Sequence, residues 1–482
     1  MNRLYITTAI PYVNASPHIG FGLELIQTDA AARYWRGRLG LQNVRALTGT
    51  DENSLKNVRA AEEAGEDVAE FVERHAQEYR ALQKTLNLSF DDFIRTREER
   101  HIKGAQKLWS SCKPGDIYKK LYKGLYCVGC ELFYTEKEVP DKKCPEHKTE
   151  LELVEEENYF FKLSNYQAKL EELISSDAIR IVPESRKNET LSFIRQGLED
   201  FSISRSKERA KNWGVPVPGD DSQVMYVWFD ALSNYINALG YKDEGDLYQN
   251  FWVDQACHKV HVIGKGVLRF HAIYWPAMLL SAGIPLPNEI FVHGYITVEG
   301  QKMSKSLGNV YQPKELVDEY GVDAVRYYFL REVPAHGDAD YSKARIEERY
   351  AELANQLGNL VGRIATMANK YFDGRLDRVE LDLTDRQKQL DEAMAEYDFK
   401  RYVDTVFDLI GIANELIDRE APFKLVETDP DRAKAVLSEL AEQIRFVGNA
   451  LLPIIPETAQ EVLRRYEGDV ILEGDPLFPR RD

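Results

Sequence analysis

The stretch IPYVNASPHIGFGLELI, residues Ile10–Ile26, is the most informative part of the sequence about the fold of the N-terminal domain. It begins with the end of an apolar, strand-like run that is interrupted at Pro11, and a loop of small residues follows. Ser16 is predicted as a helix N-cap and Pro17 as the first helical residue, because these residue types favour those positions. Apolar residues then recur at spacings of three and four, which predicts a helix that ends near Gly37–Gly40.

Strands are predicted on both sides of this helix, over residues 3–13 and 43–52. A strand, a helix and a second strand at this spacing imply a parallel βαβ unit. A second unit of this kind follows much later, with strands over 259–264 and 289–296 around an apolar helix over 267–282. Two half-sheets so far apart in the sequence predict one doubly wound, Rossmann-like α/β domain that carries a large insertion.

After about Tyr341 the sequence pattern becomes that of a helical bundle. Apolar residues recur there at spacings of three and four, and further helical stretches cover most of residues 385–450. The predicted seam consists of Ile346, Tyr350, Leu353, Leu357, Leu360, Ile364 and Met367. The expected architecture is therefore an α/β domain followed by an all-α domain.

Composition limits the classes of protein that the chain can represent. It has 482 residues, 44% of them hydrophobic, which suits several globular domains. The net charge of −17 excludes a scaffold that is basic throughout and binds nucleic acid over its whole surface. No apolar run is long enough to span a membrane, and residues 1–13 are interpreted as a strand and not as a signal peptide. Five cysteines do not make a disulfide framework, so a cytoplasmic location is expected.

Two short pairs of metal-binding residue types, Cys127-Val-Gly-Cys130 and Cys144-Pro-Glu-His147, are separated by residues 131–143. Each pair can hold a metal from a tight turn, and two pairs complete a tetrahedral zinc site. Free or redox-active thiols are the alternative, but no thioredoxin-like strand precedes the first pair. One structural zinc is therefore predicted, and the other two cysteines are interpreted as buried or incidental.

Two features point to phosphate, although the chain has neither G-x-x-x-x-G-K-[ST] nor G-x-G-x-x-G. One is His18 with Gly20 and Gly22 at the predicted helix start, because free N–H groups and the positive end of the helix dipole attract anions there. The other is the run Lys302-Met303-Ser304-Lys305-Ser306, in which two lysines and two hydroxyls could clamp a polyanion. If each segment is considered alone, the alternative for the first is an ordinary helix start, and the alternative for the second is a solvated surface loop.

Together, these two segments resemble the two signature motifs of class I aminoacyl-tRNA synthetases. Further segments are similar to those of the methionyl-tRNA synthetase family: TGTDE (Thr48–Glu52), the cysteine cluster, NWGVPVP (Asn212–Pro218), YVWFDA (Tyr226–Ala231) and FHAIYWPAML (Phe270–Leu279). The resemblance extends from about residue 3 to about residue 460. It implies an enzyme that makes methionyl-adenylate from ATP and L-methionine and then transfers the methionyl group to tRNA(Met), including initiator tRNA.

The resemblance also implies an ATP site without a general base, since the attacking carboxylate is already ionised. His18, Lys302 and Lys305 would act on the phosphates, and Mg²⁺ would accompany ATP. The implied ATP-binding residues are Pro11, Asn14, His18, Gly20, Phe21, Gly294, Tyr295, Ile296, Lys302, Met303, Ser304, Lys305 and Ser306.

The methionine pocket that the resemblance implies is apolar and aromatic, a setting that suits sulfur. Its residues are Ile10, Tyr12, Asp51, Trp228, Ala231, Tyr235, Phe270, His271 and Trp275. Asp51 would pair with the α-ammonium group. Without the resemblance, a plain core role would be the better interpretation of Trp228 and Trp275.

The C-terminal bundle resembles the anticodon-reading domain of the family. Asn359 and Arg363 are four residues apart and therefore share a helix face, which lies off the apolar seam. Phe423 matches the aromatic residue that stacks on the anticodon. A solvated surface pair is the alternative for Asn359 and Arg363.

Four positions depart from the usual motifs of the family. Phe21 stands in place of a histidine, Asn53-Ser54 in place of His-Gly, Gly266 in place of an acidic residue and Phe423 in place of tryptophan. Phe21 removes one candidate donor to ATP phosphates, and Phe423 keeps a stacking surface without an indole N–H.

The expected domains are a split catalytic domain (1–112 and 220–295), a connective insertion with the zinc site (113–219), a KMSKS and stem-contact region (296–345) and a helical anticodon-binding domain (346–482). The dimerising domain found in some members of the family is not recognised, so a monomer is expected. The alternatives are a class I synthetase for another amino acid and a non-catalytic tRNA-binding paralogue that lost activity through Phe21.

Overall fold

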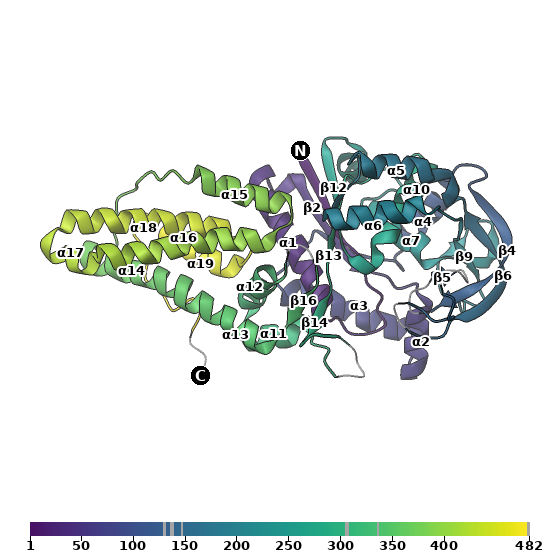
Figure 1. Ribbon diagram of the computed structural model, residues 1–482, viewed down its shortest axis with the longest axis horizontal. Coiled ribbons are helices and arrows are strands. Elements are labelled where there is room, and N and C mark those ends of the chain that lie inside the picture. The colour runs from purple at the N-terminus through teal and green to yellow at the C-terminus, as the bar shows by residue number, and fades with distance from the viewer. Residues whose placement is uncertain (129–131, 135–138, 146–147, 304–307, 335–336, 480–482) are drawn as a thin grey trace. The chain divides into compact units, whose positions relative to one another are not determined.

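The computed structural model describes residues 1–128, 132–134, 139–145, 148–303, 308–334 and 337–479. The chain divides into two compact units (Figure 1). The first unit contains Met1–Pro17, Leu39–Gln83 and Ser89–His293, and the second contains His18–Arg38, Lys84–Leu88 and Gly294–Asp482. None of the described helices is both long enough and apolar enough to cross a membrane.

The first unit is built on a six-stranded sheet with the order β3-β2-β1-β12-β13-β7, in which every neighbouring pair is parallel. Its strands are β1 (Arg3–Thr8), β2 (Val44–Thr50), β3 (Asp92–Arg95), β7 (Arg180–Val182), β12 (Cys257–Gly264) and β13 (Glu289–His293). Ile6 of β1 pairs with Ala46 on one side and Val260 on the other. The predicted doubly wound parallel sheet is therefore confirmed.

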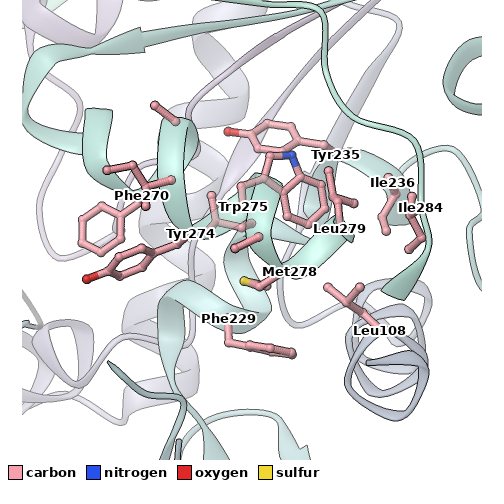
Figure 2. Close-up of a cluster of buried hydrophobic side chains, with 14 of the residues drawn as sticks. Leu108, Phe229, Tyr235, Ile236, Phe270, Tyr274, Trp275, Met278, Leu279 and Ile284 are labelled. Atoms are coloured by element: carbon pink, nitrogen blue, oxygen red, sulfur yellow. The ribbon is translucent and has the colours of Figure 1, made fainter. Parts of the chain in front are cut away.

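One large hydrophobic cluster joins this sheet to helices of the first unit. It includes Tyr5 of β1, Leu108 of α4 (Glu99–Ser111) and Met278 of α10 (Trp275–Ala282), and Figure 2 shows the part around Trp275. The other helices between these strands are α2 (Leu55–Ala64), α3 (Val68–Thr85), α5 (Gln167–Ser175), α6 (Glu184–Arg195), α7 (Val227–Leu232), α8 (Asn234–Asn237) and α9 (Asp246–Tyr248). Tyr235 and Trp275, two candidate pocket residues, belong to the same cluster and therefore stand on the rigid core.

The predicted insertion, residues 113–219, forms mainly antiparallel structure. One sheet has the order β5-β4-β6-β8 and the other the order β10-β11-β9. Their strands are β4 (Ile117–Cys127), β5 (Leu132–Tyr134), β6 (Glu152–Phe161), β8 (Phe201–Ser202), β9 (Ser204–Ser206), β10 (Pro216–Val217) and β11 (Asp220–Met225). The segment also supplies β7 to the edge of the main parallel sheet, so it is not structurally separate from that sheet.

The second unit contains a helical bundle, as predicted. Its helices are α13 (Lys343–Glu352), α14 (Asn359–Phe372), α15 (Thr384–Ala395), α16 (Phe399–Glu420), α17 (Pro422–Thr428), α18 (Pro430–Leu451) and α19 (Pro456–Tyr466) (Figure 1). Seam residues such as Leu353, Leu360 and Ile364 are fully buried, because an apolar stripe at helical spacing must face a neighbouring helix.

The same unit also contains α1 (Ile19–Leu39), α11 (Pro313–Tyr320), α12 (Val322–Glu332) and a small sheet of order β15-β14-β16. The strands of that sheet are β14 (Ile296–Val298), β15 (Gln301–Lys302) and β16 (Ala339–Tyr341).

A fully buried arginine on α12 ties these parts of the second unit together. Arg326 donates through Nη2 to Asp29 of α1 at 2.8 Å and to the carbonyl of Pro453 at 3.0 Å. Its Nε donates to the carbonyl of Ile454 at 2.9 Å, and Nη1 donates to that of Leu86 at 3.2 Å. Only a planar, permanently charged guanidinium offers this many fixed donors, so lysine would not replace it.

We predict that Arg326→Met lowers the free energy of unfolding of the second unit by about 3–5 kcal/mol. The buried Asp29 loses one of its two arginine partners, since Arg33 remains, and three buried carbonyl groups lose their donor. Urea denaturation followed by hydrogen exchange measures the loss. The control is Arg464→Met, which removes an arginine paired with Glu461 at the surface and should change stability by less than ~1 kcal/mol. Equal losses in the two variants would contradict the prediction.

Candidate active site

The strand order of the main sheet reverses between β1 and β12. From β1 the chain moves outward to β2 and β3, and it returns on the other side of β1 with β12 and β13. Ligands of doubly wound sheets bind at such a reversal, beyond the carboxyl ends of the strands. Ile10 and Tyr12 follow β1, Asp51 follows β2, and Phe270 and His271 follow β12.

Three aromatic side chains from distant parts of the sequence meet at this place. The ring of Trp228 lies flat on that of Phe270, with centroids 3.6 Å apart and planes 5° apart. Tyr12 meets Trp228 edge to face at 6.3 Å. Tyr12 and Trp228 are half-buried, whereas Phe270 is buried. The structure therefore brings three of the predicted methionine residues into one aromatic wall.

Tyr235 and His271 form a buried pair beside this wall. His271 donates from Nδ1 to the carbonyl of Val267 at 2.9 Å, so its Nε2 is the acceptor for the Tyr235 hydroxyl at 2.7 Å. Burial lowers the pKa of His271 to about 4, and the ring is therefore neutral at physiological pH. The edge of Trp228 also faces this ring, with centroids 6.4 Å apart.

Trp275, predicted for the pocket, is fully buried and belongs to a second network that the sequence reasoning missed. Its Nε1 donates to Nε2 of His261 at 3.3 Å, and Nδ1 of His261 lies 2.8 Å from the Thr7 hydroxyl. The His261 ring lies 4.0 Å from that of Tyr235. A histidine inside the apolar strand run KVHVIG was the available signal, because such a residue needs partners on both nitrogens when buried.

Two of the predicted methionine-binding residues are aliphatic. Ala231 of α7 is buried, and Ile10 is partly buried against the hydrophobic cluster of the first unit.

Asp51 lies in a tightly held loop between β2 and α2. Its main-chain N–H donates to the carbonyl of Pro11 at 2.8 Å, and its own carbonyl accepts from Nδ2 of Asn57 at 3.0 Å. The carboxylate accepts from the main-chain N–H of Asn53 at 3.2 Å. Asp51 is buried. Sequence reasoning did not identify Asn53 as a partner.

The helix that follows His18 begins later than predicted. Helix α1 starts at Ile19, and neither Ser16 nor Pro17 is part of it. The reason is a tertiary hydrogen bond, since the N–H of Ile19 donates to the carbonyl of Tyr311 at 3.0 Å. His18 itself closes the helix start: its carbonyl accepts from the N–H of Gly22, and its Nδ1 accepts from the N–H of Gly20 at 3.0 Å.

The prediction of free N–H groups at this helix start is therefore wrong, because the first four all have partners within the chain. The proton of the neutral imidazole must then reside on Nε2, since Nδ1 is an acceptor. Close packing of protein around the ring lowers the pKa of His18, although part of the side chain is exposed. His18 thus presents one neutral N–H donor.

Packing leaves little room for a side chain at the glycines of the first signature. A Cβ at Gly20 would lie 2.9 Å from the His18 ring and 3.4 Å from the end of Met303. A Cβ at Gly22 would lie 3.1 Å from Pro313. Met303 of the second signature and Pro313, which follows it, therefore lie against the first turn of α1.

The predicted adenine residues lie at a second close approach in the second unit. A Cβ at Gly294 would lie 1.8 Å from the carbonyl oxygen of Gly337, so only glycine fits. The N–H of Tyr295 donates to Asp338 at 2.9 Å, and its carbonyl accepts from Ala339 at 2.9 Å. Ile296, the third of these residues, begins β14 and is buried.

Several predicted residues cannot be joined into one ATP site. Ser304, Lys305 and Ser306 lie outside the described residues, and of Lys302 only the backbone, in β15, is described. Pro11 and Asn14 belong to the first unit, whereas His18, Phe21 and the other described candidates belong to the second.

The predicted zinc ligands are described only in part. Cys127 ends β4 and is buried, and Cys144 is buried at the start of a tight turn in which its carbonyl accepts from Lys148 at 2.8 Å. Cys130 and His147 lie outside the described residues. No group of three metal-binding side chains occurs among the residues that are described.

The three predicted anticodon residues line one cavity of about 450 Å³ in the second unit. Asn359 and Arg363 reach it from α14, and Phe423, 45% exposed, reaches it from α17. Arg363 also donates to Asp418 at 3.2 Å. Sequence reasoning missed the remaining walls, which include Thr366, Met367, Arg465 and residues 474–478.

A parallel sheet with an aromatic cluster at its strand reversal, in one chain with a helical bundle, is the architecture expected of a class I aminoacyl-tRNA synthetase. The family model described as "tRNA synthetases class I (M)" matches residues 4–153 and 147–365, and the "Anticodon binding domain of methionyl tRNA ligase" matches residues 372–470. The chain belongs to the methionyl-tRNA synthetase family.

Individual relatives agree with this assignment. The chain is 43% identical to the methionine–tRNA ligase of Brucella suis, with 99% of this chain and 98% of the relative covered. It is 41% identical to that of Caldanaerobacter subterraneus, with 99% and 79% covered. Among solved structures, Mycobacterium tuberculosis methionyl-tRNA synthetase in complex with methionyl-adenylate has a TM-score of 0.92 and 37% identity, with 100% of both chains covered.

Proposed function

We propose that the chain ligates L-methionine to tRNA(Met) in two steps, through methionyl-adenylate. The observation that carries the proposal is the aromatic wall at the strand reversal, with a buried carboxylate in the loop after β2. A solved relative of 37% identity is described as a complex with methionyl-adenylate.

Methionine binds with its side chain against the aromatic wall of Tyr12, Trp228 and Phe270. Thioether sulfur is favourable at the edges of such rings, and the neutral His271 adds a polar but uncharged neighbour. Asp51 receives the α-ammonium group, because a buried carboxylate binds a cation more strongly than one in water. The side chain of the substrate is thus selected by shape and polarity, and its amino group by charge.

Adenylate formation needs positioning and charge stabilisation more than proton transfer. A methionine carboxylate oxygen attacks the α-phosphorus of ATP, the bond from that phosphorus to the bridging oxygen breaks, and pyrophosphate leaves. His18 donates from Nε2 to a phosphate oxygen, and Lys302 and Lys305 stabilise the charge of the leaving pyrophosphate. The adenine binds at Gly294, Tyr295 and Ile296. Mg²⁺ bound to ATP would neutralise part of the phosphate charge.

The bundle reads the anticodon. Asn359 and Arg363 offer amide and guanidinium donors to base edges, and the exposed ring of Phe423 offers a stacking surface in the same cavity. The partners are elongator and initiator tRNA(Met). The enzyme acts as a monomer in the cytoplasm.

One structural zinc is bound by Cys127, Cys130, Cys144 and His147. Two of these residues are buried cysteines on tight local structure, which is the setting of a zinc knuckle. The metal would fold the loops of the insertion and take no part in the reaction.

Methionine-dependent exchange of pyrophosphate into ATP tests the activity. Pure protein should catalyse it with methionine and not with leucine or cysteine.

We predict that Lys305→Ala lowers kcat by about 10²–10³ while the Kd of methionine hardly changes, because the lysine acts on charge that develops in the transition state. The control is Lys314→Ala, which removes an exposed lysine paired with Asp318 on α11. Absence of exchange in the unmodified protein would support a non-catalytic tRNA-binding paralogue.

We predict that Arg363→Ala lowers kcat/KM for tRNA(Met) in aminoacylation roughly ten- to a hundredfold, as expected for one base-edge contact. Pyrophosphate exchange, which needs no tRNA, should be unchanged. The matched control is Arg432→Ala, which breaks an exposed pair with Glu420 at 2.9 Å on the same bundle. The same loss in both variants would show that the surface charge of the bundle matters and not the cavity.

Metal analysis of freshly purified protein should give about one zinc per chain. Cys144→Ser should reduce the zinc content to near zero and lower the thermal midpoint, whereas Cys112→Ser, outside the cluster, should leave both unchanged. A zinc content well below one in the unmodified protein would refute the site.

A further inference from the structure

A buried carboxylate that the proposed mechanism does not use lies on the pocket helix α7. Asp230 is fully buried, two residues after Trp228 and next to Ala231. Its Oδ2 accepts one hydrogen bond, from Nδ2 of Asn53 at 3.3 Å. Its Oδ1 has no hydrogen-bond partner in the part of the chain that the structure describes. A carboxyl group so poorly compensated is costly to bury for packing alone.

The nearest ionisable neighbour of Asp230 does not neutralise it. Nε2 of His101 lies 3.7 Å from Oδ1, beyond a hydrogen bond. Burial lowers the pKa of His101 to about 3, so this ring is neutral, and burial raises the pKa of Asp230 well above its usual range. Among the described residues, no lysine or arginine forms an ion pair with Asp230.

Asn53 connects Asp230 to the proposed ammonium site. Its side-chain Nδ2 donates to Asp230 and to the carbonyl of Thr96, both at 3.3 Å. Its main-chain N–H donates to the Asp51 carboxylate at 3.2 Å. The two hydrogen bonds of the Asn53 side chain therefore fix the main-chain N–H that donates to Asp51. Asp230, on α7, accepts one of these two hydrogen bonds.

We propose that Asn53 and Asp230 are positioning residues that hold Asp51 in the orientation that receives the α-ammonium of the amino acid. This inference rests on the proposed function. It also accounts for the departure at residue 53, where the family usually has histidine: asparagine, like histidine, supplies a side-chain N–H donor. Residue 53 must therefore provide a side-chain hydrogen-bond donor to Asp230, and either asparagine or histidine can provide one.

The test compares two ligands that differ only in the amino group, L-methionine and 4-(methylthio)butanoate. Their dissociation constants are measured by titration of tryptophan fluorescence, and the ratio reports binding of the ammonium group. Asn53→Ala should reduce this ratio about tenfold, as expected for a hydrogen bond that orients a charged group. Binding of the ligand without the amino group should hardly change, which a general loss of structure would not produce.

A matched control and an exchange variant separate positioning from stability. Asn165→Ala removes an Asn–Asp hydrogen bond of the same length, 3.3 Å to Asp116, elsewhere in the first unit, and should leave the ratio unchanged. The double variant Asn53→Asp/Asp230→Asn exchanges donor and acceptor and should restore most of the ratio.

The outcomes for Asp51 distinguish this inference from the proposed function. If Asp51→Asn abolishes the preference for methionine while Asn53→Ala leaves it intact, the positioning role is overturned and the ammonium site stands. If Asp51→Asn also leaves the preference intact, both the ammonium site and the inference are overturned. Failure of the double variant to restore the ratio after a loss in Asn53→Ala would overturn the role of Asp230.

Discussion

The reversal of strand order between β1 and β12 is the constraint on which the candidate pocket depends. The chain connects β1 to β2 on one side of the sheet, and β12 lies on the other side of β1. The loops at the carboxyl ends of β1 and β12 therefore diverge and leave space for a ligand between them. Residues after β1, β2 and β12 therefore meet although they are far apart in the sequence. The aromatic wall and Asp51 are consequences of topology, and the side chains provide the chemistry.

Buried histidines give this pocket an unusual electrostatic character. His261 and His271 each have a partner on both ring nitrogens, and burial lowers the pKa of each ring, so neither carries a charge. The two rings therefore provide polar groups without a positive charge, so they do not compete with the substrate ammonium group for the carboxylate of Asp51. In the proposed function, the two rings would therefore contribute no charge beside the zwitterionic substrate.

Features with a long or repeated sequence signal were predictable, and features that depend on one tertiary contact were not. The parallel sheet and the bundle followed from apolar patterns that extend over many residues. The start of α1 did not, because Tyr311 binds the N–H of Ile19 from far along the chain. Strand β7 has three residues, too few for a pattern. Arg326 looked like an ordinary charged helix residue, since nothing local indicates the carbonyl groups that converge on it. Pocket residues were found through motifs. Asn53 and Asp230 stood beside or within quoted motifs but were given no role, and His261 stood in none of them.

The histidine that closes the start of α1 has a consequence for turnover. A charged imidazolium would hold a polyphosphate with bonds about twice as strong as those of a neutral donor. In the proposed cycle, such strong binding would apply to ATP and to pyrophosphate alike, and pyrophosphate would dissociate slowly. Because Nδ1 of His18 is occupied by the N–H of Gly20, the ring offers a single uncharged donor. Under the proposed function, the helix start would therefore allow release of pyrophosphate as well as binding of ATP, and the stronger interactions would come from Lys302 and Lys305.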